Sequence, residues 1–243
     1  MRAWWAQTRA EVQMTIRRGE TLLLTLGIPI LLLVFFSLTH VTTTPPGGRI
    51  NFIAPGILAL CVLSTSLVAL SIATGFERTY GVLRRLHVTP LGQRRLIAAK
   101  ISAVVVTEVI QVVVLGLVAL GLHWKPRGGV TGALEVAGAL LLGSAGCAGI
   151  GLLLAGRLRA EVNLAAANGL YLVLLLMSGI VVPLTSLPSA IRRVALYLPS
   201  GAMADVLHRV LGQAGPASPA DWWTLGVWAL AAPLLAARTF RFD

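Results

Sequence analysis

The chain has 243 residues, of which 56% are hydrophobic and 12% charged, with a mean hydropathy of +0.84. A soluble domain carries about 25% charged residues, so this chain has too few to cover a water-soluble fold of its length. The formal net charge of +11 does not indicate a nucleic-acid partner, because the basic residues lie between long apolar runs. Both cysteines lie in apolar runs as well, which excludes a disulfide framework and a cysteine metal site.

Six apolar runs are each long enough to cross the roughly 30 Å core of a bilayer as a helix. They cover residues 21–39, 52–74, 101–122, 132–155, 162–182 and 221–237. The last run is the weakest signal, because it is short and Pro233 interrupts it. We predict an all-α membrane protein in which residues 21–243 form one six-span domain.

Residues 1–20 form a charged lead with helical spacing of its apolar side chains. Trp5, Val12 and Ile16 share one face, and three arginines lie within reach of lipid phosphates. We predict an amphipathic helix lying on the membrane surface. A simple helical lead into the first span is the alternative.

Lysine and arginine are distributed unequally between the loops. With the N-terminus inside, the inside segments hold 14 of these residues, and outside segments of nearly equal total length hold 6. The positive-inside rule therefore predicts that both termini are cytoplasmic in a multi-pass protein of the cell membrane. Topology also accounts for the net charge.

Several kinds of chemistry are missing from the sequence. No G-x-x-x-x-G-K-[ST] phosphate loop occurs, no histidine lies within a span, and no span carries two carboxylates one turn apart. We predict no catalytic residue, no metal site and no cofactor bound by this chain. Energy for uphill transport would have to come from another protein.

The loop of residues 75–100 is the most informative segment. We predict a short helix over residues 78–90 with an apolar side and a basic side, stopped by Thr89 and Pro90. A cytosolic partner could bind such a helix at the mouth of a helical bundle. The alternative is a basic loop that happens to be helical.

The same loop resembles the hallmark of ABC-2 type transport permeases, roughly E-R-E-x-G-x-L-x-x-L-x-x-x-P followed by a Gly- or Ala-Lys. The matching residues are Glu77, Arg78, Gly81, Leu83, Leu86, Pro90 and Lys100. Thr79 stands where the family often has a second acid. Residues 51–58 resemble the family's F-x-x-P-G motif, and residues 187–207 resemble its outer segment, with Asp205 in place of the usual Glu. Within the family, the chain resembles the actinobacterial drug-resistance permeases of the daunorubicin-resistance type.

This resemblance implies the permease subunit of an ATP-binding cassette exporter for an amphipathic drug-like or lipid-like substrate. Two permease subunits, identical or sibling, would pair in membrane lipid and dock two copies of a separate ATP-binding subunit, which holds ATP and magnesium. The lead helix and the loop helix would be the docking parts. The implied coupling residues are Glu77, Arg78, Gly81, Leu83, Arg84, Leu86 and Pro90.

Polar residues inside the spans are candidates for the substrate pathway. Glu108 is the one acid deep inside a span, with Gln111 one turn further on. An intramembrane acid marks either a cation or proton contact or a helix–helix hydrogen bond, and both remain open. The other candidates, each with helix packing as its alternative, are Ser64, Ser71, Asn163 and Asn168. A stand-alone secondary transporter or channel with Glu108 as its coupling acid is the alternative function.

Residues 183–220 form the longest outside segment, and three prolines divide it. We predict one or two short helices that lie at the outer membrane surface or dip back into the membrane. Arg192, Arg193 and Asp205 are the candidates for an outer gate. Adjacent arginines point about 100° apart on a helix, so one acid cannot pair with both. We therefore expect the arginines to contact lipid phosphates.

Overall fold

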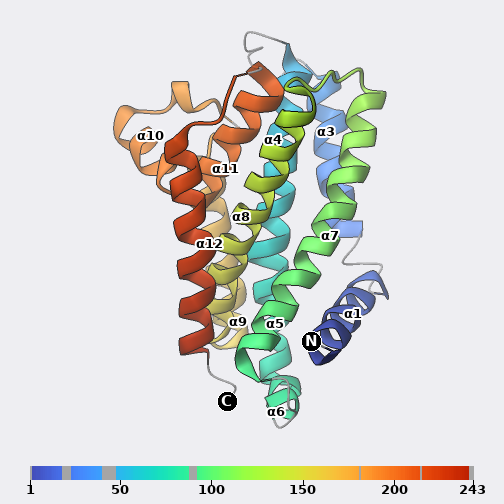
Figure 1. Ribbon diagram of the computed structural model, residues 1–243, viewed down its shortest axis with the longest axis vertical. Helices are drawn as coiled ribbons and strands as arrows, with labels where there is room; N and C mark the ends of the chain where they lie inside the picture. The colour runs from blue at the N-terminus through green and yellow to red at the C-terminus, as the bar shows by residue number, and fades with distance from the viewer. Residues whose placement is uncertain are drawn as a thin grey trace.

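The computed structural model describes residues 2–17, 23–39, 48–87, 92–180, 182–213 and 215–240. All regular elements in these ranges are helical, and the long ones run side by side along one axis (Figure 1). The N-terminus, the C-terminus and α6 lie at one end of this bundle, here called the α6 end (Figure 1). The long helices are α4–η2–α5 (49–79), α7 (Gln93–Gly121), α8 (Gly129–Ala155), α9 (Ala160–Met177) and α12 (Pro219–Thr239). The shorter elements are α1 (Arg2–Arg17), η1 (Leu23–Gly27), α3 (Ile28–Leu38), α6 (Val82–His87), η3 (Leu184–Ser186), α10 (Ser189–Leu196), α11 (Pro199–Leu207) and η4 (His208–Gln213).

Within the described ranges, four helices are long and apolar enough to cross a membrane: 49–79, 95–121, 129–155 and 160–177. The prediction of an all-helical membrane protein is confirmed, and four of the six predicted spans coincide with these candidate spans. The helix 25–38 is apolar but shorter, and α12 is long enough but less apolar. The first and the sixth span therefore remain predictions.

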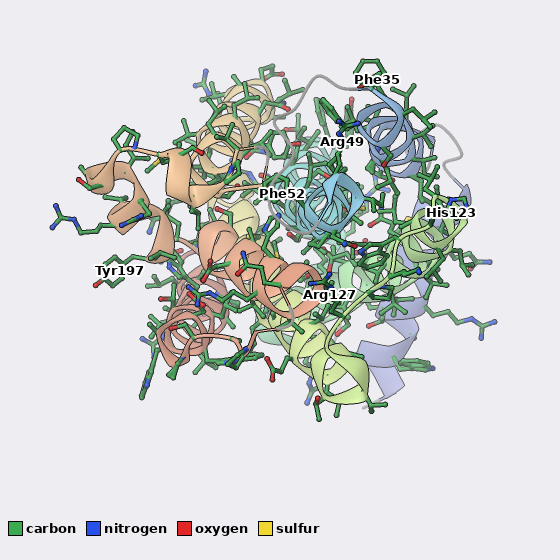
Figure 2. All side chains as sticks on the ribbon, turned by 90° about the horizontal axis from the view of Figure 1, so that it is seen from above. Phe35, Arg49, Phe52, His123, Arg127 and Tyr197 are labelled. Carbon is green, nitrogen blue, oxygen red and sulfur yellow. The ribbon has the colours of Figure 1, made fainter. Side chains whose placement is uncertain are left out.

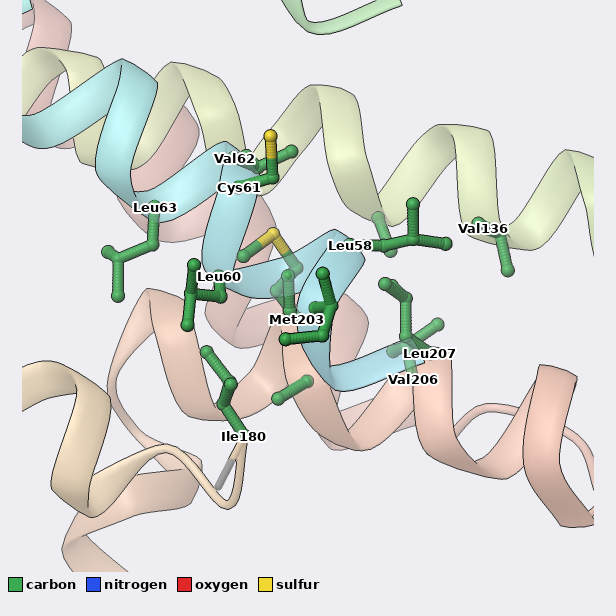
Figure 3. Packing of buried hydrophobic residues seen from close by; sticks show 14 of the residues in the cluster. Leu58, Leu60, Cys61, Val62, Leu63, Val136, Ile180, Met203, Val206 and Leu207 are labelled. Atoms are coloured by element: carbon green, nitrogen blue, oxygen red, sulfur yellow. The ribbon is translucent and has the colours of Figure 1, made fainter. Parts of the chain in front are cut away.

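The second span lies at the centre of the bundle and is longer than expected. α4 (Arg49–Leu63), η2 (Ser64–Ala69) and α5 (Leu70–Thr79) form one continuous helix, and every residue from Ile53 to Leu63 is buried. Figure 3 shows Leu58, Leu60 and Leu63 of this helix among side chains of other elements, such as Met203 and Leu207. Because nearly all of its surface is covered, this helix needs apolar residues on every side rather than on one stripe.

The helix α8 packs closely against α12 along a seam of small residues. A Cβ atom added at Gly149 would lie 2.5 Å from the Pro233 nitrogen, and one at Gly146 would lie 3.1 Å from Trp228 Cβ. Glycine lets two helix backbones approach each other in this way. Gly146 and Gly149 therefore allow the close packing of α8 on α12.

The lead helix α1 rests on α7 near the α6 end (Figure 1). Thr8 is buried, whereas Trp5 on the expected apolar face is 61% exposed. The helix exists as predicted, but the face that it turns to the bundle is polar. The reason is the ion pair between Glu11 and Lys100 of α7, which sequence periodicity does not reveal.

The segment between α9 and α12 divides into an outer and an inner part. The arginines of α10 are exposed, and α10 is joined to α12 where the indole Nε1 of Trp228 donates to the Tyr197 carbonyl at 2.8 Å. By contrast, α11 is buried against α4, α8 and α12, and only Asp205 of its residues is not fully buried. The exposed α10 thus fits the expectation of a surface helix, and the buried α11 fits the alternative of a segment that dips back in.

Figure 2 looks along the bundle axis onto the end opposite α6. Phe52 lies near the centre there, and Phe35 and Tyr197 lie toward the rim (Figure 2). The ring of His208 stacks on Phe52 with 4.5 Å between centroids, and its nitrogens contact the carbonyl oxygens of Ala204 and Phe52. This contact joins η4 and α11 to α4.

Candidate functional site

The turn between α5 and α6 begins the candidate site. α5 ends at Thr79, and Gly81 has φ +71°, a left-handed conformation that favours glycine. Its N–H donates to the Arg78 carbonyl at 3.0 Å, which closes the end of the helix. The prediction that this helix begins at residue 78 is therefore wrong. Glu77 and Arg78 belong to the last turn of the long central helix, and the separate helix begins at Val82.

Three charged residues from α1, α5 and α7 meet near the α6 end of the bundle. We call them the basal cluster: Glu11, Glu77 and Lys100. The Lys100 ammonium lies 2.6 Å from the Glu77 carboxylate and 2.9 Å from that of Glu11. The lysine side chain is 2% exposed, and the two acids are 17% and 13% exposed. Charge-assisted hydrogen bonds are the strong class of hydrogen bond, so this cluster fixes three helices to one another.

Two further contacts attach the turn to the rest of the bundle. The Arg78 guanidinium donates to the Ala155 carbonyl at the end of α8, at 2.7 Å. Leu83 of α6 is fully buried and packs with Leu96 and Ile97 at the start of α7. Arg84 and Arg85 are exposed on α6. The side chain of Leu86 and the whole of Pro90 lie outside the described residues.

A second polar group lies between η2 and α7, near the middle of the long central helix. The Thr65 hydroxyl donates to Gln111 Oε1 at 3.1 Å, and Gln111 Nε2 donates to the Thr25 carbonyl at 3.4 Å. Glu108 lies one turn away and is 5% exposed. Its Oε1 has no hydrogen-bond partner among the described residues. Gln111 thus serves helix association, while Glu108 keeps an unsatisfied oxygen at membrane depth.

The remaining pathway candidates are a buried pair, Ser71 and Asn163, the half-buried Ser64 and the exposed Asn168. The Ser71 hydroxyl donates to Asn163 Oδ1, and Asn163 Nδ2 donates to the Ser71 carbonyl, both at 2.9 Å. This pair joins α5 to α9 and is completely buried. Among the described residues, the Ser64 hydroxyl and the Asn168 amide donate only to carbonyl oxygens of their own helices.

The three outer-gate candidates do not come together. Asp205 of α11 pairs with Arg209 one turn later, whereas Arg192 and Arg193 lie on the exposed helix α10. Asp221 at the start of α12 lies near Asp205 and is 2% exposed. The arginines therefore have the exposure that lipid contact requires, and the acid belongs to a different contact.

The chain matches a known protein family. A family model described as ABC-2 type transporter matches residues 2–210. The chain belongs to the ABC-2 type transporter family. No curated protein matches it. It is a transmembrane permease of an ABC transporter, and members of this family normally work with an ATP-binding subunit.

The family membership assigns the chain to the transport part of the complex. An ABC-2 permease domain is an integral membrane subunit and is not itself an ATPase. Across the described ranges, no group of three or more His, Cys, Asp or Glu residues could hold a metal ion.

Sequence reasoning missed Glu11 as a site residue. It lies 66 positions before Glu77, and only the packing of α1 on α7 brings the two acids to one lysine. One signal was available, because Glu11 is one of only two acids in a basic lead segment of this ABC-2 permease. Lys100 matched the family motif but had no assigned partner.

Proposed function

We propose that this chain is the membrane subunit of an ATP-driven exporter that moves an amphipathic drug-like or lipid-like substrate out of the cell. Two permease chains, identical or sibling, pair in the cell membrane and dock two copies of a separate ATP-binding subunit, which holds ATP and magnesium. Each chain crosses the membrane six times, and both termini are cytoplasmic. The α6 end then faces the cytoplasm.

The basal cluster is the observation that carries this proposal. α6 follows α5 directly, and Glu77 at the end of α5 is bonded to Lys100 of α7, which is bonded to Glu11 of α1. Arg78 adds the end of α8 to the same group. A push on α6 therefore moves several helices together, whereas an isolated surface helix would only bend.

Docking and coupling use different residues in this scheme. Arg84 and Arg85 are exposed on α6, and α6 stands at the end of the bundle where a partner can approach it. Closure of the ATP-binding subunits displaces α6 and α1, and the ion pairs transmit that displacement to α5 and α7. Rigid packing turns a small shift at one end into a change of access at the other.

The test is a matched pair of charge reversals in the permease purified with its ATP-binding subunit. Arg84→Glu with Arg85→Glu changes two adjacent exposed arginines on α6, and Arg192→Glu with Arg193→Glu does the same on α10. We expect the α6 pair to weaken association about tenfold or more and to abolish ATP-dependent transport. The α10 pair should leave association unchanged.

Thermal unfolding of the permease alone is the control, because all four arginines are exposed and neither double variant should change its midpoint. Equal association for both double variants contradicts the docking role of α6. Transport that continues in vesicles without the ATP-binding subunit contradicts the exporter as a whole.

Glu108 supports a second candidate function, a stand-alone secondary transporter. A carboxylate with an unsatisfied oxygen deep in a membrane helix is a functional candidate by default. In that case a pH gradient would drive transport without ATP, and Glu108→Gln would abolish it. The exporter predicts instead that ATP drives transport and that the pH gradient does not.

A further inference from the structure

A cavity of about 680 Å³ lies on one side of the bundle, between α1, α5, α6 and α7. On the long central helix, residues that lie one turn apart form a stripe along the cavity: Thr65, Ala69, Ile72 and Phe76. At 1.5 Å per residue, the stripe from Thr65 to Glu77 is roughly 18 Å long. The facing wall on α7 runs from Lys100 to Thr107. The cavity is therefore elongated and has the size of a site for a drug-like molecule.

The two ends of the cavity differ in chemistry. Threonine hydroxyls of α4–η2–α5 and α7 line one end, and the intermediate walls are aliphatic. At the α6 end the lining consists of the basal cluster and an aromatic pair, Phe76 and Tyr80, whose rings stack with 6.1 Å between centroids. The cavity thus offers a long apolar chamber with charge and aromatic faces at one end only.

The charge that the cavity presents is acidic. Lys100 is 2% exposed and bonded to two carboxylates, so little of its positive charge reaches the cavity. Glu77 is 17% exposed and uses Oε2 for Lys100, and the described residues contain no hydrogen-bond partner for its Oε1. Glu77 and the two aromatic rings line the same end of the cavity, and a carboxylate together with aromatic rings is a combination that binds organic cations, by ion pairing and by cation–π attraction.

We propose that this cavity is a binding site for an amphipathic organic cation. The positive group lies between Glu77 and the Phe76–Tyr80 pair, and the apolar body extends along the stripe toward Thr65. The inference that this cation is a transported substrate rests on the proposed function. The inference that the cation binds in this cavity is independent of it. Because Glu77 also holds Lys100, an occupied site stiffens the same helices that α6 would push.

The experiment measures binding to the purified permease in nanodiscs of zwitterionic lipid, without any ATP-binding subunit. Two probes of nearly the same shape and opposite charge are used, tetraphenylphosphonium and tetraphenylborate. We expect saturable binding of the phosphonium, with one site per chain, and at least tenfold weaker binding of the borate. Equal binding of both probes, or no saturable binding of the phosphonium, overturns the inference.

Two substitutions locate the probe. Glu77→Gln keeps the side-chain shape but removes its charge, so we expect about tenfold weaker phosphonium binding and borate binding that is no weaker than before. Ala73→Phe fills the cavity wall, so we expect both probes to be excluded. Ala137→Phe places the same ring at an exposed position of α8 and should leave binding unchanged.

These variants also separate the site from a general loss of fold. The effect of Glu77→Gln is measured as the ratio of the phosphonium affinity to the borate affinity. Partial unfolding would weaken the binding of both probes and would not change this ratio selectively. Unaltered phosphonium affinity in Ala73→Phe places the probe elsewhere and overturns the inference. If the phosphonium binds but ATP does not drive transport, the binding site stands and the exporter is refuted. If ATP drives transport but no probe binds in this cavity, the exporter stands and the binding site is refuted.

Discussion

The two sides of the bundle are held together by different means. On the α8–α12 side, glycines bring two helix backbones into contact, and a Cβ atom at Gly149 would lie 2.6 Å from the Ala232 carbonyl carbon. On the α1–α7 side, a cavity of about 680 Å³ remains open, and the basal cluster joins the helices at one end of it. The first contact is continuous and apolar, and the second is local and charged.

This difference indicates which side moves. Close-packed backbones lose many small attractions at once when they separate, so the α8–α12 side acts as a fixed wall. A side with a cavity loses little when it opens or closes, provided that its few strong contacts persist. The basal cluster therefore stands where a hinge would be expected.

Gly149→Leu should have the largest effect and would test the fixed wall. No side chain fits between Gly149 and the backbone of Pro233, and backbone atoms cannot move aside as a flexible side chain can. We expect the variant to give no folded monodisperse protein in detergent. Gly226→Ala on α12 is the control, because no atom lies within 4 Å of the added methyl group. Normal yield and midpoint for Gly149→Leu would show that the seam is not tightly packed.

Lys100→Met should have the next largest effect and would test the charged side. The change leaves two carboxylates close together without their shared ammonium, and breaking a buried ion pair costs about 3–5 kcal/mol. We expect a lower thermal midpoint and loss of ATP-dependent transport. The exposed lysine provides the control, because Lys125→Met should change neither quantity. A midpoint as high as that of the unmodified protein would mean that the cluster does not hold the helices together.

Asn163→Ala sharpens the comparison between packing and pathway. Asn163 exchanges two hydrogen bonds with Ser71, so we expect a loss of about 2 kcal/mol in the free energy of unfolding. Transport per folded molecule should stay the same. Asn168→Ala removes an exposed side chain that bonds only to its own helix and should change neither value. Reduced transport of selected substrates at full stability would instead assign Asn163 to the pathway.

Glu108→Gln should have the smallest effect on stability. The amide keeps the shape of the side chain and removes a charge that would be costly at membrane depth. We expect the free energy of unfolding to change by no more than about 1 kcal/mol, as measured by denaturant titration in detergent. If Glu108 contacts a cation in the pathway, transport of a cationic probe falls and that of a neutral probe does not. Equal loss for both probes leaves the charge of Glu108 without a binding role.

Local patterns in the sequence predicted the elements of this protein well. The long helices of residues 49–79, 95–121, 129–155 and 160–177 follow from runs of apolar residues, because no polar backbone group can stay unpaired in a membrane. The lead helix and the motif residues Glu77, Arg78 and Gly81 were also found. Gly81 was assigned to a helix, although a glycine near a helix end is a common signal for its termination.

The sequence by itself thus determined that the chain is a helical membrane protein, and its motif indicated the permease family. Only the tertiary structure decided which helices meet, that α11 belongs to the core, and that Glu11 and Glu77 share Lys100. The physical reason is the distance along the sequence over which each kind of interaction acts. Helix formation and membrane insertion depend on residues within one segment, whereas an ion pair between residues 11 and 100 exists only after several helices have packed.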